Sequence, residues 1–549
     1  MKSEWYKDIV FYQIWPRSFK DGNGDGIGDL YGVYDKLEYI ASLGAGGIWF
    51  SPLYASPNAD YGYDIADYRR IAPEYGDLDI FRKVLDKAHS IGLKVIMDLV
   101  INHTSDEHEW FQKSRDKNSP YRDYYFWRPG RSSGRAPNNW GGLFEKECWK
   151  YDEKSGEYYL HLFSSKQPDL NMDNPKVRAE IKDIMRYWLD MGIDGFREDV
   201  ITYISKTPGL PDDSSPIVKG MKYYSCGPRL HEYLKEFREV TDNYNCFTVG
   251  EAPMMTPRKA LEFISGPGRD LDMMFHFQHM EADCFMTEYM PLPFSLRKLK
   301  RAFSRWQKEL WQKGWNALYI ENHDHPRIIS RYGSEKYRVE SGKMLAVSYL
   351  LQQGTPFVYQ GQEIGMTNIS LDSIDEYKDC VAVNKYNDNK GKKDEKKLMA
   401  LINRASRDSA RTPVQWSGAA NAGFSSAKPW FEVNPNYHEI NVEAEEKDPA
   451  SLLNFYRKLI HYRNSSEAVR NGSYREYRRL SSRLYVYSRE YGNKKLLAIC
   501  SFSEKPVRFH FPKGFDSARA KLIFNNYEVS GEGASSFTAK PYETRVYEF

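Results

Sequence analysis

The stretch Gly195-Phe196-Arg197-Glu198-Asp199-Val200 ends a short apolar segment with a carboxylate, two residues after an arginine. Two further acids end similar segments downstream: Glu251 follows 247–250, and Asp324 closes the run at 319–324. Acids at the ends of successive parallel strands can meet in one pocket. Such a pocket suits a reaction that passes through a cationic sugar transition state.

Short apolar segments alternate with longer amphipathic ones along much of the chain. Segments of strand length lie at 9–14, 47–50, 95–99, 195–199, 247–250, 273–277, 317–320 and 357–359. Stretches with helical periodicity lie between them, for example 80–91, 177–191 and 296–311. Eight strands separated by crossovers of this length predict an α/β fold, a (β/α)8 TIM barrel.

One connection is too long for a barrel crossover. Roughly 75 residues separate the strand ending near Asp98 from the helix near Val177, and compact domains rarely carry a loop of that length without structure of its own. We therefore expect a small inserted domain after strand 3 at 104–172, within a catalytic barrel formed by 1–103 and 173–472. From Ser473 short runs alternate apolar and polar residues, which predicts a C-terminal antiparallel β-sandwich over 473–549.

The composition is that of an ordinary soluble globular protein. The chain has 78 basic and 75 acidic residues, a net charge of +3 and no basic stripe, so we expect no nucleic-acid partner. The six cysteines form no CxxC pair, which argues for reduced thiols rather than disulfides or zinc. The N-terminus lacks a signal-peptide core and no apolar run is long enough to span a membrane. We expect a cytoplasmic protein with no membrane partner.

The candidate acids would lie at the catalytic end of the barrel, where strands end. Glycoside hydrolysis needs one carboxylate that attacks the anomeric carbon and one carboxylic acid that protonates the leaving oxygen. Arg197 and Asp199 lie two residues apart, so they point to the same side, and the guanidinium favours the ionised carboxylate. Glu251 follows an apolar strand, where desolvation raises the pKa of a carboxyl group and suits it to be the acid.

The motifs resemble glycoside hydrolase family 13, the α-amylase family, and within it the oligo-1,6-glucosidase and dextran-glucosidase group of α-glucosidases. The resemblance runs along essentially the whole chain. It rests on five motifs: DLVINH at 98–103, GFREDVI at 195–201, GE at 250–251, NHD at 322–324 and QPDLN at 167–171. It implies that Asp199 is the nucleophile, Glu251 the acid/base and Asp324 the stabiliser of the transition state, with Arg197 orienting Asp199.

The same resemblance implies how the terminal glucose is held. His103 and His323 would bind its hydroxyls, and Tyr63 would form a stacking platform. Asp60, together with Arg411, would close the pocket behind the non-reducing end. A pocket closed at that end implies exo-action, with one glucose released at a time.

Val200 bears on the linkage. In this family valine directly after the nucleophile accompanies α-1,6 preference, whereas threonine or alanine accompanies α-1,4. A β-branched residue is also common in strands for purely structural reasons. We expect a retaining, exo-acting α-glucosidase that hydrolyses α-1,6-linked, isomalto-oligosaccharide-type substrates and other short α-glucosides from the non-reducing end.

Relatives with the same machinery remain alternatives. They are an α-1,4-glucosidase, a sucrose-directed glucosidase, a trehalose-6-phosphate hydrolase and a sucrose isomerase, although 277–283 lacks the Arg- and Asp-rich motif of the isomerases. A non-catalytic amylase-like interaction subunit is the alternative outside the enzymes, and the complete acid set argues against it. The expected partner is a small oligosaccharide, and the expected state is a monomer or weak homo-oligomer.

The loop Asp21-Gly22-Asn23-Gly24-Asp25-Gly26-Ile27-Gly28-Asp29 resembles the calcium loop of the family. Oxygen ligands at alternate positions suit a hard cation. The loop is not an EF-hand, because its twelfth position is Gly32 rather than glutamate. The resemblance implies a structural Ca2+, with Mg2+ as the alternative, and no organic cofactor. The ligands would be the side chains of Asp21, Asn23, Asp25 and Asp29 and the carbonyl of Ile27.

Glu198 departs from the family pattern, since relatives mostly carry an apolar residue before the nucleophile. Strand alternation points Glu198 away from the pocket and under the helices. A charge buried there needs a partner, and the sequence does not identify one.

Overall fold

The computed structural model describes residues 4–132, 134–529 and 533–549. Its largest sheet has eight parallel strands in the order β11-β10-β9-β5-β2-β1-β15-β14, and a parallel bridge between Met274 and Asn316 joins the two ends. The strands are β1 (Phe11–Ile14), β2 (Gly47–Phe50), β5 (Lys94–Leu99), β9 (Gly195–Glu198), β10 (Phe247–Glu251), β11 (Met273–Phe275), β14 (Ala317–Leu318) and β15 (Thr355–Tyr359). The predicted (β/α)8 barrel is confirmed.

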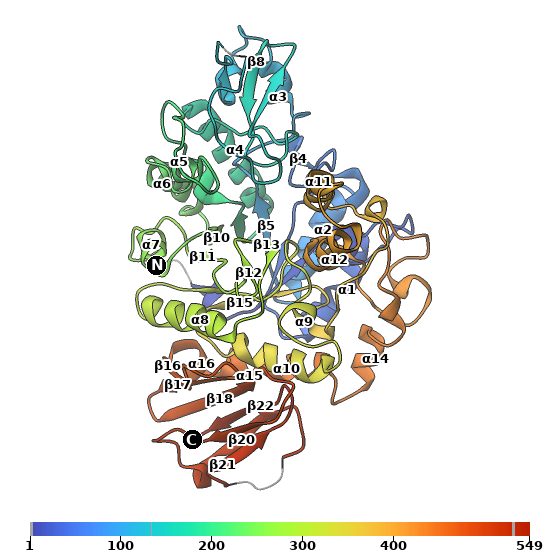
Figure 1. Ribbon diagram of the computed structural model, residues 1–549, viewed down its shortest axis with the longest axis vertical. Helices are drawn as coiled ribbons and strands as arrows, with labels where there is room; N and C mark the ends of the chain where they lie inside the picture. Colours follow the sequence, from blue (N-terminus) through green and yellow to red (C-terminus); the bar gives the residue numbers. More distant parts are fainter. Residues whose placement is uncertain (1–3, 133, 530–532) are drawn as a thin grey trace.

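One helix follows each barrel strand and covers the sheet (Figure 1). These helices are α1 (Leu30–Ser42), α2 (Leu78–Ser90), α4 (Pro175–Met191), α6 (Leu230–Thr241), α7 (Pro257–Ile264), α8 (Leu296–Leu310), α10 (Arg338–Leu350) and α15 (Leu452–Ser465). None of the helices in the described residues has the length and apolar character needed to cross a bilayer.

Helix α4 illustrates how local sequence sets the bounds. The side chain of Asn174 caps the first turn by accepting from the amide of Lys176, and Pro175 occupies the first helical position. Gly192 ends the helix with a φ of 107°, a left-handed conformation that glycine adopts without strain. Apolar residues recur with a helical period and are buried against the sheet: Val177, Ile181, Ile184, Met185 and Trp188.

Aromatic rings fill the barrel beneath the carboxyl ends of its strands. Phe11 stacks on Phe247 at 5.6 Å and on Phe357 at 5.0 Å, and Trp49 packs on Phe275 at 5.5 Å. Full burial of a ring of this size contributes about 1.5–3 kcal/mol. The lumen is therefore a packed core and not a channel.

The strand register brings the candidate acids together. Arg197 on β9 is level with Asp98 on β5 and with Val249 on β10. Side chains two positions apart share a face, so Glu251 and Asp199 extend from the same inward face one step further along. Three neighbouring strands thus each carry an acid at the end of their inward face, and these acids surround Arg197.

The segment after β5 forms a small layer of its own at the top of Figure 1. It contains α3 (Glu109–Ser114) and an antiparallel sheet in the order β6-β8-β7, made of β6 (Trp127–Arg128), β7 (Trp149–Asp152) and β8 (Glu157–Leu160). A backbone bridge between His103 and Asp169 ties the end of this segment to the barrel. The boundaries assigned to the three domains stay predictions.

The C-terminal segment forms two antiparallel sheets at the bottom of Figure 1, as predicted. The larger has the order β16-β17-β18-β22-β20, and β19 pairs with β21. Their bounds are β16 (Ser473–Tyr477), β17 (Leu484–Tyr491), β18 (Lys494–Ser501), β19 (Val507–His510), β20 (Lys521–Asn525), β21 (Ser536–Ala539) and β22 (Thr544–Glu548).

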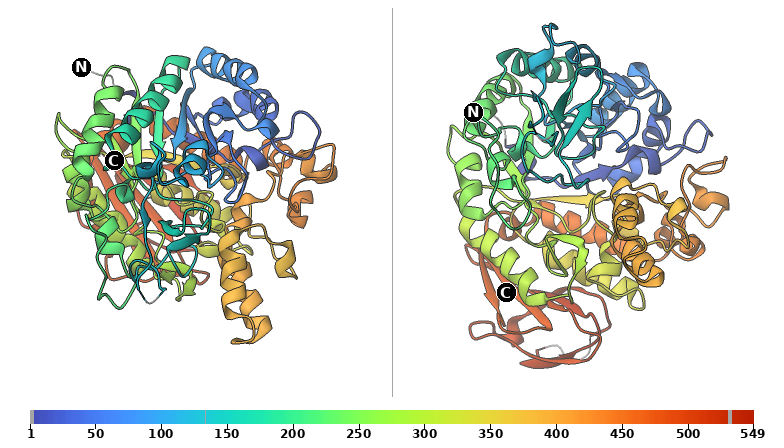
Figure 2. Two further views of the ribbon diagram at one scale, coloured as in Figure 1. Left: turned by 90° about the horizontal axis from the view of Figure 1, so that it is seen from above. Right: turned by 45° about the horizontal axis from the view of Figure 1, so that its top comes forward.

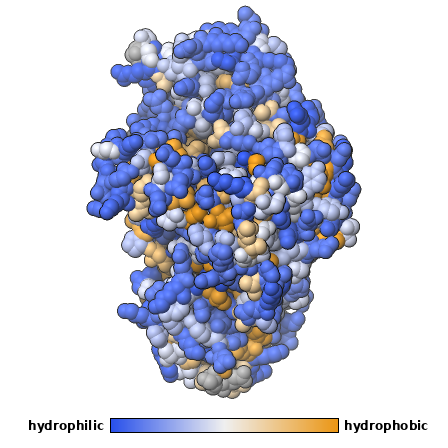
Figure 3. All heavy atoms as spheres, turned by 90° about the vertical axis from the view of Figure 1, so that its right-hand side faces the viewer, coloured by the Kyte–Doolittle hydropathy of each residue, from blue (hydrophilic) through white to orange (hydrophobic). Residues whose placement is uncertain are grey.

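The chain between β15 and α15 contains helices that the sequence analysis does not predict. They are α11 (Cys380–Asn389), α12 (Glu395–Ala405), α13 (Asp408–Arg411) and α14 (Val442–Lys447). Figure 2 shows the gold-coloured α11 and α12 extending away from the barrel. Figure 3 shows that the face of the molecule on this side is largely hydrophilic, with apolar residues gathered mainly near its middle. The segment between β15 and α15 supplies part of the candidate active site.

Candidate active site

Arg197 lies at the centre of the carboxyl end of the barrel and contacts an acid from each of three strands. Its Nη1 donates to Oδ1 of Asp199 at 2.5 Å and to Oδ1 of Asp98 at 2.7 Å. Its Nη2 lies 2.9 Å from Oε2 of Glu251. The arginine side chain is 1% exposed, so these contacts are shielded from water. The structure thus brings together the predicted nucleophile, acid and orienting arginine.

The protonation of these acids follows from three carboxyl groups sharing one guanidinium. Burial raises the pKa of Asp199 well above its usual range, and the charges of Glu251 and Asp98 add to the shift although Arg197 opposes it. Burial likewise raises the pKa of Asp98 to about 6 against the pull of Arg197. The sequence predicts that Arg197 favours the ionised form of Asp199. The predicted contact exists, and it lowers the pKa of Asp199 while burial and the charges of Glu251 and Asp98 raise it.

Tyr63, His323 and Asp324 form a continuous polar chain beside this cluster. The hydroxyl of Tyr63 donates to Oδ2 of Asp98 at 3.0 Å and lies 2.7 Å from Nε2 of His323, on which its ring also stacks. Nε2 of His323 is 3.0 Å from Oδ2 of Asp324. Burial lowers the pKa of His323 to about 4, although Asp324 opposes this. The imidazole is therefore neutral, and protein groups engage both of its nitrogens, Tyr63 and Asp324 at Nε2 and Gln13 at Nδ1.

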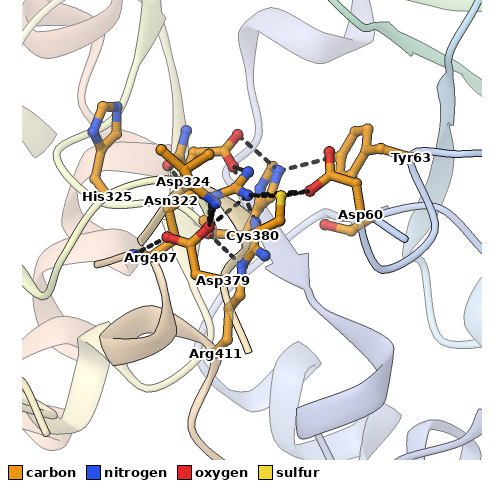
Figure 4. Close-up of polar contacts among 12 residues, drawn as sticks. Asp60, Tyr63, Asn322, Asp324, His325, Asp379, Cys380, Arg407 and Arg411 are labelled. Carbon is orange, nitrogen blue, oxygen red and sulfur yellow. Dashed lines mark hydrogen bonds and ion pairs between the residues drawn. The ribbon is translucent and has the colours of Figure 1, made fainter. Parts of the chain in front are cut away.

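A second cluster of charged groups is built around Arg407, which the sequence analysis does not identify. Its guanidinium lies 3.1 Å from Oδ1 of Asp60, 2.7 Å from Oδ1 of Asp379 and 3.3 Å from Oδ1 of Asp324. Figure 4 shows these groups converging, with Cys380 beside them. The Cys380 thiol lies 3.6 Å from Nη2 of Arg407. One cation thus holds three acids, of which Asp60 and Asp379 are buried and Asp324 is partly exposed.

Arg411, the predicted partner of Asp60, takes a different place. Its Nη2 lies 3.2 Å from Oδ1 of Asp324, and its Nε donates to the carbonyl oxygen of His323 at 3.2 Å. Its guanidinium stacks over Trp15 at 4.6 Å. The direct ion pair with Asp60 belongs to Arg407, four residues earlier. Arginines four residues apart share a helical face, and that spacing was the available sequence signal.

His103 joins the site through the inserted segment. Its Nε2 lies 3.1 Å from Nε2 of Gln167, which also donates to Oδ2 of Asp60 at 3.3 Å. Burial lowers the pKa of His103 to about 4, so the ring is neutral. Gln167 belongs to the QPDLN motif, and its position explains how the inserted segment completes the pocket.

The comparisons with known proteins agree with this geometry. The family model described as "Alpha amylase, catalytic domain" matches residues 13–472. The chain belongs to the α-amylase family. It is 48% identical to the oligo-1,6-glucosidase of Parageobacillus thermoglucosidasius, over all of this chain and 99% of that protein. It is 46% identical to the oligo-1,6-glucosidase of Bacillus cereus, over the full length of both. It matches the crystal structure of Bacillus licheniformis trehalose-6-phosphate hydrolase with a TM-score of 0.94 and 42% identity, over the full length of both.

Within this α-amylase-family site, Val200 is not the strand residue that its β-branched side chain suggests. It lies just past β9 with φ 37° and ψ 39°, a left-handed conformation that is unfavourable for valine. Its amide donates to Oε2 of Glu251 at 3.0 Å. Backbone strain concentrates at functional sites, and here it aims an amide at the predicted acid.

The predicted metal loop of this α-amylase-family chain is closed by its own backbone. Asp21 accepts from the amides of Gly24 at 2.6 Å and Gly26 at 2.9 Å. Asp29 accepts from the amides of Asn23 at 3.0 Å and Gly32 at 2.7 Å. The carboxylates are therefore held in place by hydrogen bonds within the loop.

The fit of these residues to a cation rests on donor chemistry. Within the described chain, no group of three or more His, Cys, Asp or Glu residues is placed to hold a metal ion, and the three loop acids form no such group. The predicted donors are nevertheless all oxygens, the type that Ca2+ takes. A carboxylate oxygen keeps a free lone pair beside one hydrogen bond. The donor set suits a hard cation, and the metal site stays a prediction.

Glu198, the departure from the α-amylase-family pattern, is 2% exposed on the outer side of the barrel. Its Oε2 has no hydrogen-bond partner within the described residues. Burial raises the pKa of Glu198 to about 8; Arg238 opposes the shift, and Asp272 and Asp270 add to it. Arg238 is itself held by Asp272 at 3.1 Å. Among the described residues Glu198 thus has no ion-pair partner, and its raised pKa favours the protonated form.

Proposed function

We propose that this glycoside hydrolase is a retaining, exo-acting α-glucosidase that hydrolyses α-1,6 linkages of isomalto-oligosaccharides and other short α-glucosides. The observation that carries the proposal is that Asp199 and Glu251 both contact the guanidinium of Arg197. Retaining glycosidases hold their two carboxyl groups about 5 Å apart, whereas inverting enzymes need about 6.5–9.5 Å to admit a water. Two acids within reach of one guanidinium suit the closer spacing.

The contacts assign a role to each group in two steps. Oδ1 of Asp199 is held by Arg197, which leaves Oδ2 to bond to the anomeric carbon as the glycosidic bond breaks and Glu251 gives its proton to the leaving oxygen. A water molecule then loses a proton to Glu251 and attacks the same carbon, which releases Asp199. Asp324, held by His323 and by two arginines, stays ionised and stabilises the cationic transition state.

Exo-action is supported by the wall behind the pocket. Arg407 fixes Asp60 and Asp379, and Gln167 contacts Asp60 from the inserted segment. Buried charged groups tied to one another form a rigid wall that offers hydrogen bonds to the hydroxyls of a terminal glucose. A longer chain on that side of the glucose would meet this wall.

The α-1,6 preference is supported by Val200 and by the relatives named oligo-1,6-glucosidases. Hydrolysis rates on isomaltose, maltose, sucrose and trehalose-6-phosphate test it. Isomaltose should give the highest kcat/KM, and proton NMR should show the α-anomer as the first product. A higher kcat/KM on trehalose-6-phosphate than on isomaltose would instead favour the activity for which two relatives, 42% identical to this chain, are named trehalose-6-phosphate hydrolases. Asp199→Asn should lower kcat by about 1,000-fold or more, as for other residues that act as a catalytic unit.

The finer expectations belong to the same proposal. The loop at 21–29 would hold a structural Ca2+, with Mg2+ as the alternative, through the oxygens of its side chains and the Ile27 carbonyl. A cytoplasmic location is supported by six free cysteines, because thiols persist in a reducing compartment. The protein would act as a monomer or weak homo-oligomer.

A further inference from the structure

A cleft of about 720 Å³ lies at the amino ends of the barrel strands, away from the catalytic acids. Its walls come from the segments that precede β1, β11 and β14, and from two positions near the C-terminal sheets, Asn471 and Tyr491. We name it the lower cleft. Its volume is in the range of small-molecule sites.

Two aromatic rings line the lower cleft without packing against other rings. Trp311 follows α8, and Tyr491 ends β17 with 43% of its surface exposed. Among the described residues neither ring stacks on another aromatic or lies under a cation, whereas Trp315 in the same wall is covered by the ammonium of Lys7 at 5.2 Å. Exposed ring faces are the surfaces on which the C–H faces of a pyranose pack.

The cleft also offers hydrogen-bonding groups that the protein does not use. Nε1 of Trp311 is buried and has no partner within the described residues. An indole N–H can only donate, so leaving it unpaired costs about 1–3 kcal/mol. The side chains of Gln312 and Asn471 lie exposed in the same wall and each carries a donor and an acceptor.

Four of the five charged side chains that line the cleft are paired with one another, and only the exposed Lys313 has no ion pair among the described residues. Lys7 pairs with Glu4 at 2.5 Å, and Arg269 pairs with Asp272 at 2.9 Å and with Glu4 at 3.2 Å. A cation would have to displace these pairs, and an anion would find only the exposed ammonium of Lys313. A neutral molecule with hydroxyl groups and apolar ring faces needs no charged partner.

We propose that the lower cleft is a second, non-catalytic binding site for a neutral saccharide, with Trp311 and Tyr491 as its stacking surfaces. The choice of an α-1,6-linked glucose oligomer as ligand rests on the proposed function. Such a site would hold oligosaccharide on the enzyme without hydrolysing it.

The test is equilibrium binding of isomaltotriose to a full-length Asp199→Asn, Glu251→Gln protein, which cannot turn the sugar over. Two sites per chain are expected. Adding Trp311→Ala or Tyr491→Ala should weaken one site by at least tenfold and leave the other unchanged. Tyr31→Ala is the matched control, because Tyr31 is 44% exposed on α1, outside the lower cleft. A single site that is insensitive to Trp311 and Tyr491 would overturn the proposal.

Two further measurements separate the possible failures. In the otherwise wild-type chain, Trp311→Ala and Tyr491→Ala should keep kcat/KM on isomaltose within twofold, which shows that the barrel is intact. Trp311→Phe keeps a ring but removes the N–H, and should weaken the second site less than Trp311→Ala does. If maltotriose displaces isomaltotriose only at the site that does not depend on Trp311, the α-1,6 preference proposed for catalysis is wrong, and the saccharide site in the lower cleft is still supported. If neither sugar shows binding that depends on Trp311, the saccharide site in the lower cleft is wrong, and the catalytic proposal is unaffected.

Discussion

The backbone amide of Val200 donates to Oε2 of Glu251 at 3.0 Å, and it does so from a left-handed conformation that valine rarely adopts. Glu251 thus receives one hydrogen bond from a strained amide and an ion pair from Arg197. Both contacts engage the same oxygen, which leaves Oε1 free to face a substrate. The residue that follows the predicted nucleophile therefore positions the predicted acid.

Val200→Thr is expected to lower the ratio of kcat/KM on isomaltose to that on maltose by about tenfold, equivalent to about 1.4 kcal/mol. Both residues are β-branched, so the strained backbone and its amide should be preserved, while the hydroxyl places a polar group on a buried residue that contacts Glu251. Steady-state kinetics on the two disaccharides measures the ratio. An unchanged ratio would remove the linkage argument. Ile201→Val, a fully buried neighbour, is the control.

Arg407→Met is expected to lower kcat/KM on isomaltose by about 100-fold or more, because misplacing groups that position the substrate can cost about 100-fold in rate. Asp60 and Asp379 would be left buried without their cation. Arg407→Lys should recover only part of the loss, since an ammonium cannot hold three acids with a planar fork. Arg404→Met is the matched control: Arg404 is 44% exposed and pairs with Asp283. Equal losses for the Arg404 and Arg407 variants would contradict the assigned wall.

The barrel and the strand-end acids could be predicted from the sequence because both are local patterns. A short strand and the acid that ends it stand together in the chain, as at 247–251. The contact between Arg407 and Asp60 spans 347 residues, and it depends on helices inserted between β15 and α15. The backbone conformation of Val200 was equally hidden, since its residue type favours a strand. Long-range pairing and a strained dihedral leave no periodic signal in the chain.

Removal of divalent cations is expected to lower the Tm if the 21–29 loop holds Ca2+, because a ligand that binds only the folded state stabilises it by mass action. Differential scanning fluorimetry with EGTA and then graded Ca2+ measures the shift, and Mg2+ in a parallel series identifies the preferred ion. Asp25→Ala should abolish the Ca2+ dependence, whereas Asp86→Ala, an exposed acid on α2, should keep it. A Tm that ignores both cations would refute the metal site.

Glu198→Gln is expected to stabilise the protein more at pH 8.5 than at pH 6. Burial raises the pKa of Glu198 to about 8 in the folded state, above its ordinary value of 4.5. Between these two values the folded chain keeps the proton that the unfolded chain releases, so the wild type loses stability as pH rises through this window. Above pH 8 the loss levels off. Glutamine mimics the protonated acid and removes this dependence.

The advantage of Glu198→Gln over wild type should therefore be about 3 kcal/mol larger at pH 8.5 than at pH 6, an order-of-magnitude figure from the linkage relation. Urea unfolding at the two pH values measures the difference, and contributions from other titrating groups cancel because both proteins share them. The charges of Arg238, Asp272 and Asp270 act on Glu198. The control is Asp242→Asn, which weakens the contact of Asp242 with Arg238 and leaves Glu198 itself unchanged. Equal differences at both pH values would show that Glu198 is ionised in the folded protein, with a partner that the buried geometry does not supply.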